Sequence, residues 1–550
     1  MTLNKKPPFL FQFFMVLIAF LALNGCANIQ RPQGGPRDRT PPKLLKATPE
    51  NPTRNFSAKI IQLDFDEYFR LNNQYTEITI TPNIEKFPEI YTRSKSLFIK
   101  FNPKDTLAKN TTYVINFGKA IADMNEGNVL KNFTYVFSTG PKIDSLSISG
   151  NVINTLTQVK EKDVTVLLFP LKQDSAMFGK KKPAVYTTTD TSGNFKLGNL
   201  RPGDYTLYAL KETTVNKIYD NEDELIAFLK SPVHLTKDTA NIHLNLFKQI
   251  PAKLRPIDRR IDDDGKLFFT FNKSIPTIGV KILDPTLDAI KQVNFNKTSD
   301  TTTIYLTSMA FDSVKVSFLS NGKPLDTLTL RRRKNDTYKH VLQLGYNVGS
   351  DERLKPGADL NVFTSYPVTS VDPTRVILME DSIDVSSDLK LSKNPENPKA
   401  FSVKYPWKDD KNYSISFNVG TFTDIYGNRN LLSNKKFHLD KPENYGELNL
   451  RVVLPDTGKT YVVQLLSSDN VTVLQSNVVT KTGIVSYKNF PTTKYRVRVI
   501  YDTNKNGKWD TGNLKTKTYP ENIWYYSKPF TIRPNFDDNE DLTVPKEPTP

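Results

Sequence analysis

Two stretches of this chain recur, and the repeats restrict the chain to a modular architecture. Residues 109–128 are similar to residues 411–428, and residues 193–207 are similar to residues 483–497. Each copy combines strand-like residues with a turn that contains Gly, Asn or Asp. Self-similarity of this kind is typical of modules arranged along one chain, so we expect an array of small domains rather than one large core.

Apolar and polar residues alternate with a period of two in many short segments. Residues 77–81 and 495–499 are examples, and clusters of Pro, Gly, Asn and Asp separate such segments at short intervals. This alternation is typical of antiparallel strands with one buried face, and no long stretch has helical periodicity. The sequence therefore predicts an all-β protein of tandem β-sandwich domains.

The first repeat resembles the bacterial Ig-like domain of the S-layer-protein type. The resemblance rests on the Thr-Pro-Pro sequence at 40–42, on Phe-Asp-Glu at 65–67 and on the closing turn at 123–128, and residues 347–442 match more loosely. It implies two Ig-like, all-β domains.

The second repeat resembles the transthyretin-like regulatory domain of carboxypeptidases, which is a seven-stranded sandwich without catalytic activity. The resemblance rests on residues 148–152 and 188–207, and residues 483–497 are a weaker copy. The expected order is a signal peptide at 1–25, a lipidated cysteine and flexible linker at 26–40, an Ig-like domain at 41–141, a transthyretin-like domain at 142–250, an unassigned β-sandwich at 251–346, a second, divergent Ig-like domain at 347–442, a second, divergent transthyretin-like domain at 443–540 and a disordered tail at 541–550.

The N-terminus has the pattern of a secretory signal. Two lysines precede an apolar run at 8–23, and Gly25 stands immediately before Cys26, the only cysteine in the chain. The run is short for a membrane-spanning helix, and a positive start, an apolar centre and a small residue at the cleavage point are typical of a signal peptide. Residues 23–26 resemble the bacterial lipobox, which implies diacylglycerol and an N-acyl chain on Cys26. Several acyl chains anchor a protein stably.

The linker at 31–38 resembles that of Bacteroidota lipoproteins that carry this Ig-like domain. Its Pro and Gly content is typical of an extended tether. The resemblance implies a lipid-anchored protein of the outer membrane. Residues 27–30 lack the acidic run that resembles a surface-export signal of this phylum, and the periplasmic and cell-surface sides both stay open.

The net charge of +17 does not by itself indicate a nucleic-acid partner. Lys and Arg are spread along the chain, with small clusters only at 180–182 and 331–334. No recognition motif accompanies the charge, and the chain is exported, so we expect no nucleic-acid binding. A basic surface of this kind favours anionic membrane headgroups or acidic glycans.

No motif of the sequence indicates an enzyme. His234, His243, His340 and His438 are spread over three expected domains, and the single cysteine is assigned to lipidation. A Gly-rich phosphate loop, a Gly-x-Ser-x-Gly elbow and an HExxH helix are all absent from the sequence. We expect no catalytic residues and no cofactor besides the lipid on Cys26, with calcium as the one candidate metal.

The calcium candidate is the segment from Asp502 to Asp510. Asp502, Asn504, Asn506 and Asp510 occupy ligand positions of a calcium loop, and Gly507 stands where such a loop turns sharply. The twelfth position lacks the usual Glu, and the flanks are strand-like. An Asx-Gly hairpin turn without metal is therefore the alternative.

Asp followed by Ser or Thr and a small aliphatic residue recurs along the chain. This resembles the O-glycosylation acceptor of exported Bacteroidota proteins, and the same dipeptides also initiate turns. The candidate acceptors are Thr106, Ser145, Ser175, Thr239, Ser313, Thr327 and Ser382.

The leading hypothesis is a non-enzymatic outer-membrane lipoprotein that acts as a modular scaffold or interaction subunit of a cell-envelope protein complex. Its expected partners are the outer membrane, through the lipid anchor, and an outer-membrane β-barrel or another envelope protein. The alternative is a cell-surface glycan- or peptide-binding protein. Its stacking platform would consist of Trp407, Trp509, Trp524, Tyr525 and Tyr526.

Overall fold

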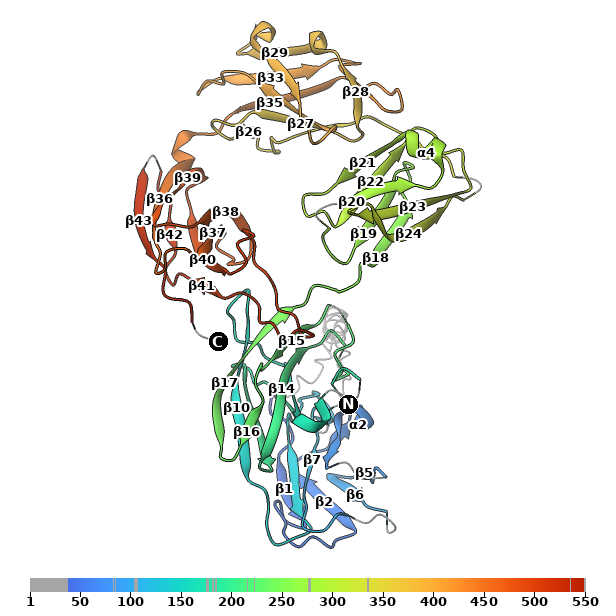
Figure 1. The fold of residues 1–550 in the computed structure, drawn as a ribbon, viewed down its shortest axis with the longest axis vertical. Coiled ribbons are helices and arrows are strands. Elements are labelled where there is room, and N and C mark those ends of the chain that lie inside the picture. Colours follow the sequence, from blue (N-terminus) through green and yellow to red (C-terminus); the bar gives the residue numbers. More distant parts are fainter. Residues whose placement is uncertain are drawn as a thin grey trace, which may run out of the picture. The chain divides into compact units, whose positions relative to one another are not determined.

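The computed structural model describes residues 38–548 apart from 83, 85, 103–106, 175–177, 181, 182, 184, 215, 222, 276, 277, 334, 335 and 535. Strands dominate this part of the chain and pair mainly in antiparallel fashion (Figure 1). The predicted all-β class with tandem β-sandwiches is confirmed. The chain divides between residues 144 and 145 into two compact units.

The first unit is the first sandwich, and its core lies between two sheets. Along β2, Ile61, Leu63 and Phe65 are buried while the residues between them are not, which is the alternation that the sequence predicts. The strands are β1 (Leu44–Thr48), β2 (Ile60–Phe65), β3 (Phe69–Leu71), β4 (Thr79–Thr81), β5 (Glu89–Arg93), β6 (Ser96–Lys100), β7 (Thr112–Asn116), β8 (Ile121–Asp123) and β9 (Thr134–Ser138), with helix α2 (Gln74–Glu77) before β4. The sheet orders are β1-β2-β6-β5 and β4-β7-β9, and β3 pairs with β8.

The second unit begins with the second sandwich, at residues 145–250. Its strands are β10 (Leu146–Asn154), β11 (Thr165–Pro170), β12 (Val185–Thr188), β13 (Asn194–Leu200), β14 (Gly203–Lys211), β15 (Leu225–Phe228), β16 (Val233–Leu235) and β17 (Thr239–Lys248). Sheet order is β12-β11-β14-β15-β17-β10-β13, β16 pairs with β14, and β10 runs parallel to β17. Strand β11 is buried on both faces: Val166 and Leu168 face the inner core, while Leu167 and Phe169 belong to a separate apolar cluster.

The third sandwich, which had no assigned family, has the strand order of the first. Its strands are β18 (Pro256–Ile261), β19 (Leu267–Phe271), β20 (Ile278–Ile282), β21 (Lys291–Phe295), β22 (Thr301–Leu306), β23 (Ser313–Ser320) and β24 (Lys323–Arg331). The orders β18-β19-β22-β21 and β20-β23-β24 correspond to β1-β2-β6-β5 and β4-β7-β9. Helix α4 (Pro285–Ala289) is capped by Asp284, whose carboxylate accepts the N–H groups of Thr286 and Leu287.

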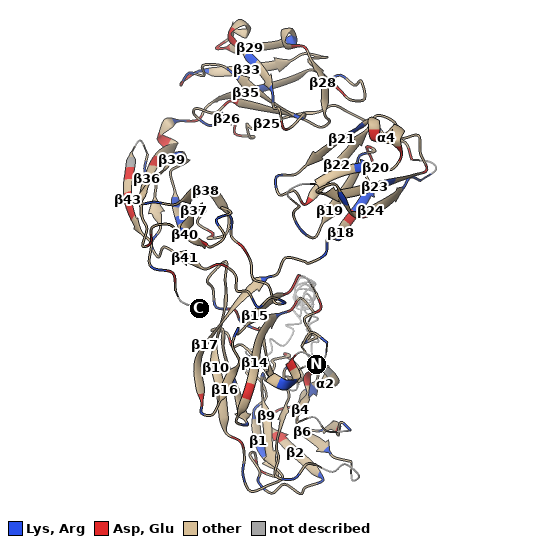
Figure 2. Ribbon diagram, viewed as in Figure 1, with Lys and Arg blue, Asp and Glu red and all other residues tan. Residues whose placement is uncertain are grey.

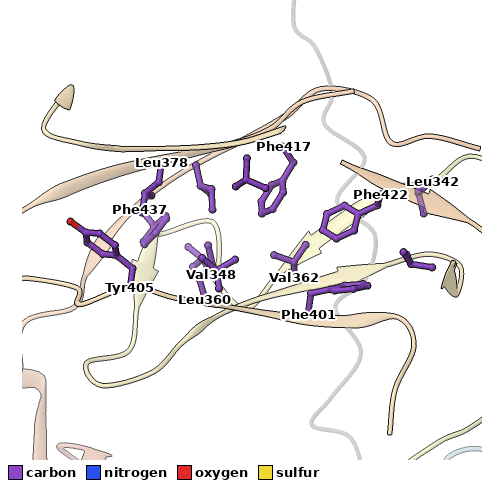
Figure 3. Packing of buried hydrophobic residues seen from close by; sticks show 14 of the residues in the cluster. Leu342, Val348, Leu360, Val362, Leu378, Phe401, Tyr405, Phe417, Phe422 and Phe437 are labelled. Carbon is purple, nitrogen blue, oxygen red and sulfur yellow. The ribbon is translucent and has the colours of Figure 1, made fainter. Parts of the chain in front are cut away.

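The fourth sandwich begins at β25 (Leu344–Tyr346), before the predicted boundary at 346/347, because β25 pairs with β27 (Leu360–Thr364). The other strands are β26 (Arg353–Leu354), β28 (Val368–Val371), β29 (Val376–Glu380), β30 (Ile383–Asp384), β31 (Lys390–Lys393), β32 (Ala400–Lys404), β33 (Asn412–Phe417), β34 (Phe422–Asp424) and β35 (Ser433–Leu439). Figure 3 shows Leu378 and Phe417 of one sheet pointing toward Val362 and Phe401 of the other. These side chains form the core of the sandwich.

The fifth sandwich has the strand order of the second, except that its strands form two sheets where the β15–β17 pairing joins those of the second into one. Its strands are β36 (Tyr445–Val453), β37 (Thr460–Leu466), β38 (Val473–Val479), β39 (Gly483–Pro491), β40 (Lys494–Asp502), β41 (Ile523–Tyr525), β42 (Phe530–Thr531) and β43 (Asp537–Thr543). The sheets are β39-β36-β43 and β38-β37-β40-β41, β42 pairs with β40, and β36 runs parallel to β43 as β10 does to β17.

The predicted disordered tail at 541–550 is wrong for its first residues. Strand β43 continues to Thr543 and pairs with β36, and Leu542 and Val544 are buried in the core of the fifth sandwich. The prediction of disorder rested on the charged and Pro-rich composition of the C-terminus, which does not show that buried and exposed residues alternate there.

The first sequence repeat also has the same hydrogen bonds in both copies. In the first sandwich, the Asn128 amide donates to the buried Asp123 carboxylate over 3.0 Å, and in the fourth, the Asn428 amide donates to the buried Asp424 carboxylate over 3.2 Å. The Asp and Asn that the two copies share therefore close each turn and stabilise the fold.

Candidate functional site

The predicted calcium loop connects β40 to β41 in the fifth sandwich. Asp502 is the last residue of β40, is 3% exposed and is held in register opposite Thr460 of β37. The chain then turns with Lys505 and Gly507 in the left-handed region, at φ of 61° and 76°. Glycine is suited to this conformation, which agrees with the position of Gly507 in the motif.

Hydrogen bonds bring the four predicted ligand residues together. The Asp502 carboxylate accepts the N–H groups of Asn506 at 3.1 Å and Gly507 at 2.8 Å. Asp510 accepts from the Asn506 side-chain amide at 2.7 Å and also from the Asn504 amide. The loop is thus wrapped around its two carboxylates.

This arrangement suits either an Asx turn or a hard cation. The hydrogen bonds already satisfy both carboxylates, as an Asx turn requires. A calcium ion requires oxygen ligands, and the side-chain amides of Asn504 and Asn506 present an oxygen when each is rotated by half a turn. Within the described residues, no group of three or more His, Cys, Asp or Glu side chains is placed to hold a metal. A cation at this loop therefore depends on the two asparagines.

Glu521 is a site residue that the sequence motif did not identify. It is 7% exposed, and its carboxylate accepts the N–H of Thr503 at 2.7 Å and the N–H of Asp510 at 3.0 Å. The Nε1–H of Trp509 donates to its backbone carbonyl at 3.0 Å. Glu521 thus ties both ends of the loop together. One sequence pattern could have identified Glu521. In the second and the fifth sandwich alike, a Glu stands two residues before a paired Ile of the strand that follows the loop: Glu224 before β15 and Glu521 before β41.

The corresponding loop of the second sandwich has the same backbone pattern with different chemistry. Glu212 accepts the N–H groups of Asn216 at 2.7 Å and Lys217 at 2.6 Å, as Asp502 does from the equivalent residues. Lys217, with φ of 63°, occupies the position of Gly507, and its side chain is buried over the ring of Tyr186. The Asn216 side-chain amide donates to Asp220 at 2.9 Å, as Asn506 does to Asp510, so the two loops share this hydrogen bond as well and differ at the glycine position.

The remaining predicted residues do not form a common site. Cys26, Thr106 and Ser175 lie outside the described residues. Ser145, Ser313, Thr327 and Ser382 are exposed, and Thr239 is partly buried in β17. Accessible hydroxyl groups are compatible with glycosylation, which stays a prediction.

The proposed aromatic platform is not assembled. Trp407 packs into the core of the fourth sandwich against Tyr405 and Tyr413, with ring centroids 5.0 Å away in both cases. Trp524 and Tyr526 pack on the core of the fifth sandwich. All five residues of the predicted platform are partly buried, and the rings of Trp407, Trp524 and Tyr526 cover hydrophobic cores.

The four histidines are also separate. His234 contacts Asp204 at 2.6 Å and His243 contacts Asn151 at 3.0 Å, both on the surface of the second sandwich. His340 stacks on Tyr426 with a centroid distance of 3.6 Å, and His438 lies in β35. Among the described residues these histidines do not form a nucleophile–base pair.

Charge is mixed along the described chain. In Figure 2 basic and acidic segments are interspersed in each sandwich. The described residues include no helix that is both long enough and apolar enough to cross a membrane. The apolar run at 8–23 and the lipobox lie outside them.

The fold and the loop define a tandem β-sandwich protein with one candidate cation site. Residues 38–139 match the family model of the bacterial Ig-like domain. This agrees with the resemblance of the first domain. A search of curated proteins found no match.

Solved structures with similarity to this chain include three proteins with low TM-scores. The S-layer protein SbsC has 11% identity and a TM-score of 0.15, covering 88% of this chain and 66% of its own. The major pilin BcpA of Bacillus cereus has 11% identity and a TM-score of 0.14, covering 73% and 99%. The Bacteroides ovatus glucan-utilisation protein SGBP-B has 10% identity and a TM-score of 0.17, covering 70% and 93%. Scores this low give no information about the function of this chain.

Proposed function

We propose that this chain is a non-enzymatic modular scaffold of the cell envelope. The observation that carries the proposal is the series of β-sandwiches, each with its own hydrophobic core and built on two recurring strand orders. Arrays of this kind present edges and loops at defined intervals to partner proteins.

The scaffold is held at the outer membrane through Cys26. The sequence before Cys26 has the order of a lipoprotein signal, and stable anchoring requires more than one acyl chain. Metabolic labelling with an alkyne fatty acid is expected to mark the native protein and not a Cys26→Ala variant. A Cys26→Ala variant that is labelled and membrane-bound as strongly as the native protein would contradict the anchor.

The partner is an outer-membrane β-barrel or another envelope protein. Purification of the tagged native chain in mild detergent is expected to recover one such protein at constant stoichiometry, identified by mass spectrometry. The Cys26→Ala variant is the matched control, because its sandwiches are unchanged and only its location differs. Protease treatment of intact cells establishes which side of the membrane the scaffold occupies. Recovery of the native chain alone would contradict its role as a subunit of a complex and would favour the glycan- or peptide-binding alternative.

We also propose that the loop from Asp502 to Asp510 binds calcium. Trp509 lies inside the loop, so terbium bound there is expected to show sensitised luminescence that calcium displaces. Asp510→Asn removes one of two carboxylates and is expected to weaken terbium binding at least about tenfold. Asp469→Asn, in an exposed turn of the same sandwich, is the control. Equal luminescence from all three proteins would favour the metal-free Asx turn.

A further inference from the structure

The outer face of the β11-β14-β15 sheet in the second sandwich is unusually apolar. Leu167, Phe169, Tyr208 and Phe228 on this face, and Phe247 of the adjoining strand β17, are each at most 3% exposed. An antiparallel sheet of a sandwich usually has one face on the core and one in water. Burial on both faces therefore requires a covering element.

Part of the cover is local and part comes from the fifth sandwich. Phe178 and Tyr219 of the second sandwich pack on the face, and so do Leu514 and Tyr519, which lie in the loop between β40 and β41. The corresponding loop of the second sandwich, which contains Tyr219, covers its own sheet. The longer loop of the fifth sandwich covers the sheet of another domain.

The covering segment, residues 511–519, is a preformed turn. Asn513 and Thr518 exchange two backbone hydrogen bonds of 2.8 and 2.9 Å, and the Asn513 side chain accepts the N–H of Thr516 at 3.1 Å. Lys517 has a left-handed φ of 52°. A segment that is ordered by its own hydrogen bonds loses little conformational entropy when it docks.

Tyr519 makes the central contact. Its ring stacks on Phe228 with a centroid distance of 5.3 Å and an interplanar angle of 24°. Its hydroxyl accepts the backbone N–H of Lys230 at 2.7 Å. Beside it, a Cβ at Gly512 would come within 2.6 Å of the ring of Phe247, so any other residue there requires the ring or the turn to shift.

Hydrogen bonds to the end of β17 and to the residue after it surround the apolar part of the contact. Thr511 donates its hydroxyl to the carbonyl of Lys248 at 2.6 Å, and the N–H of Leu514 donates to the Gln249 side chain at 2.7 Å. These bonds fix the position of the turn along the strand end. Apolar stacking alone would allow it to slide.

Lys517 adds a charged group to the same contact. Its ammonium donates to the Tyr208 hydroxyl at 2.6 Å, and that hydroxyl donates to Asp174 at 2.8 Å. The ammonium also lies 4.4 Å from the ring centroid of Tyr208 and 5.1 Å from that of Phe228. Cation–π contacts of this kind are strongest when water is excluded.

We propose that residues 511–519 are an intramolecular latch, whose binding surface is the outer face of the β11-β14-β15 sheet. The latch docks the fifth sandwich on the second across the whole of the intervening third and fourth sandwiches. The two sandwiches therefore keep a fixed separation. This property goes beyond the proposed scaffold function and does not depend on the lipid anchor or on a partner.

The test measures the distance between the two sandwiches in the full chain. Spin labels are placed at the exposed positions Lys237 and Lys528, in a Cys26→Ala background, and the distance distribution is measured by pulsed electron resonance. Tyr519→Asp places a charge against Phe228 and is expected to broaden the distribution about twofold or more, since unlatched domains move freely. Lys515→Asp, an exposed position in the same turn, is the control and is expected to keep the native distribution.

A second variant tests the contact from another side. Gly512→Val introduces a side chain against Phe247 and is expected to give the same broadening. Hydrogen exchange in β14 and β40 is measured in parallel, and unchanged protection of β40 shows that the fifth sandwich stays folded. A broad distribution in the native chain, or native distributions in both Tyr519→Asp and Gly512→Val, would overturn the latch.

Discussion

Glu380 offers the sharpest test of how a single buried charge stabilises one sandwich. It is the last residue of β29 and is 8% exposed. Its carboxylate accepts hydrogen bonds from Tyr405 at 2.8 Å, Tyr413 at 3.3 Å and Lys408 at 2.8 Å. Tyr405 appears at the margin of the core in Figure 3. We predict that replacing Glu380 unfolds the fourth sandwich at a lower denaturant concentration.

The magnitude follows from the partners. A hydrogen bond to a charged group contributes about 1.5 to 3 kcal/mol, and the longer Tyr413 bond lies at the lower end. The Lys408 side chain is 57% exposed, so its ion pair adds only about 0.5 kcal/mol. Glu380→Ala is therefore expected to reduce the free energy of unfolding by about 3.5 to 5 kcal/mol. Glu380→Gln keeps one acceptor oxygen and is expected to cost about 1.5 kcal/mol.

The stabilisation of the fourth sandwich by Glu380 is expected to decrease as the pH falls. Hydrogen bonds from Lys408 and Tyr405 hold the pKa of Glu380 below its usual value. The charged form is thus favoured by folding, and its contribution is complete above the pKa of an unfolded Glu, about 4.3. It is lost as the pH falls through the lower pKa of the folded state. The stability difference between the native chain and Glu380→Gln is therefore expected to shrink below about pH 4.

The assay must report on the fourth sandwich alone, because an array of domains does not unfold as one two-state unit. The chain has three tryptophans, and Trp407 is the one in this sandwich. Replacing Trp509 and Trp524 by Phe leaves Trp407, which packs on Tyr405 and Tyr413, as a local fluorescence probe. Urea titrations are then compared at pH 7 and at acid pH.

Glu396 provides the matched control. It is exposed in the same sandwich, and Glu396→Gln is expected to change stability by less than about 0.5 kcal/mol. The reasoning is refuted if Glu380→Gln is as stable as Glu396→Gln at pH 7. It is also refuted if the deficit of Glu380→Gln stays constant through the acid range.

Other positions give independent tests. Gly150→Ala would place a Cβ against the carbonyl of Ile242 and is expected to lower the stability of the second sandwich by about 3 kcal/mol. Gly198 has open space around its Cα, so Gly198→Ala is expected to raise that stability by about 0.5 kcal/mol. Hydrogen exchange of the β10 amides measures both changes. Truncation after residue 540 removes the buried Leu542 and Val544 and is expected to destabilise the fifth sandwich by about 4 kcal/mol, measured by denaturant titration with Trp524 as the only tryptophan. Unchanged stability after truncation would mean that the end of β43 contributes nothing.

The sequence predicted the fold class and the repeats because both depend on local patterns. Alternation along β2 and β33 reflects which face of a strand is buried, and that pattern is visible without the fold. The sequence did not predict that the third sandwich has the strand order of the first. Phe271 and Asn272 resemble the Phe-Asp pair at 65–66. Two shared residues are too weak a signal when the strand pairings that define the topology are long-range.

The candidate site was predicted only where its residues are close in sequence. Asp502 to Asp510 is one loop, whereas Glu521 reaches it only because β41 pairs with β40. The latch was not predicted at all. In the sequence, the third and fourth sandwiches lie between Phe228 and the residues Leu514 and Tyr519. Nothing in the local pattern of Leu514 and Tyr519 distinguishes them from core residues of their own sandwich.

The candidate cation loop and the latch lie on one connection, which leads to a final prediction. Residues 502–510 and 511–519 are consecutive, and Glu521 binds the N–H groups of Thr503 and Asp510 at the base of both. A cation bound by Asp502 and Asp510 would therefore stiffen the base from which the latch projects. If calcium binds, we expect it to narrow the distance distribution between Lys237 and Lys528 in the native chain and to have no effect in Asp510→Asn. Narrowing that persists in Asp510→Asn would place the calcium effect elsewhere in the chain.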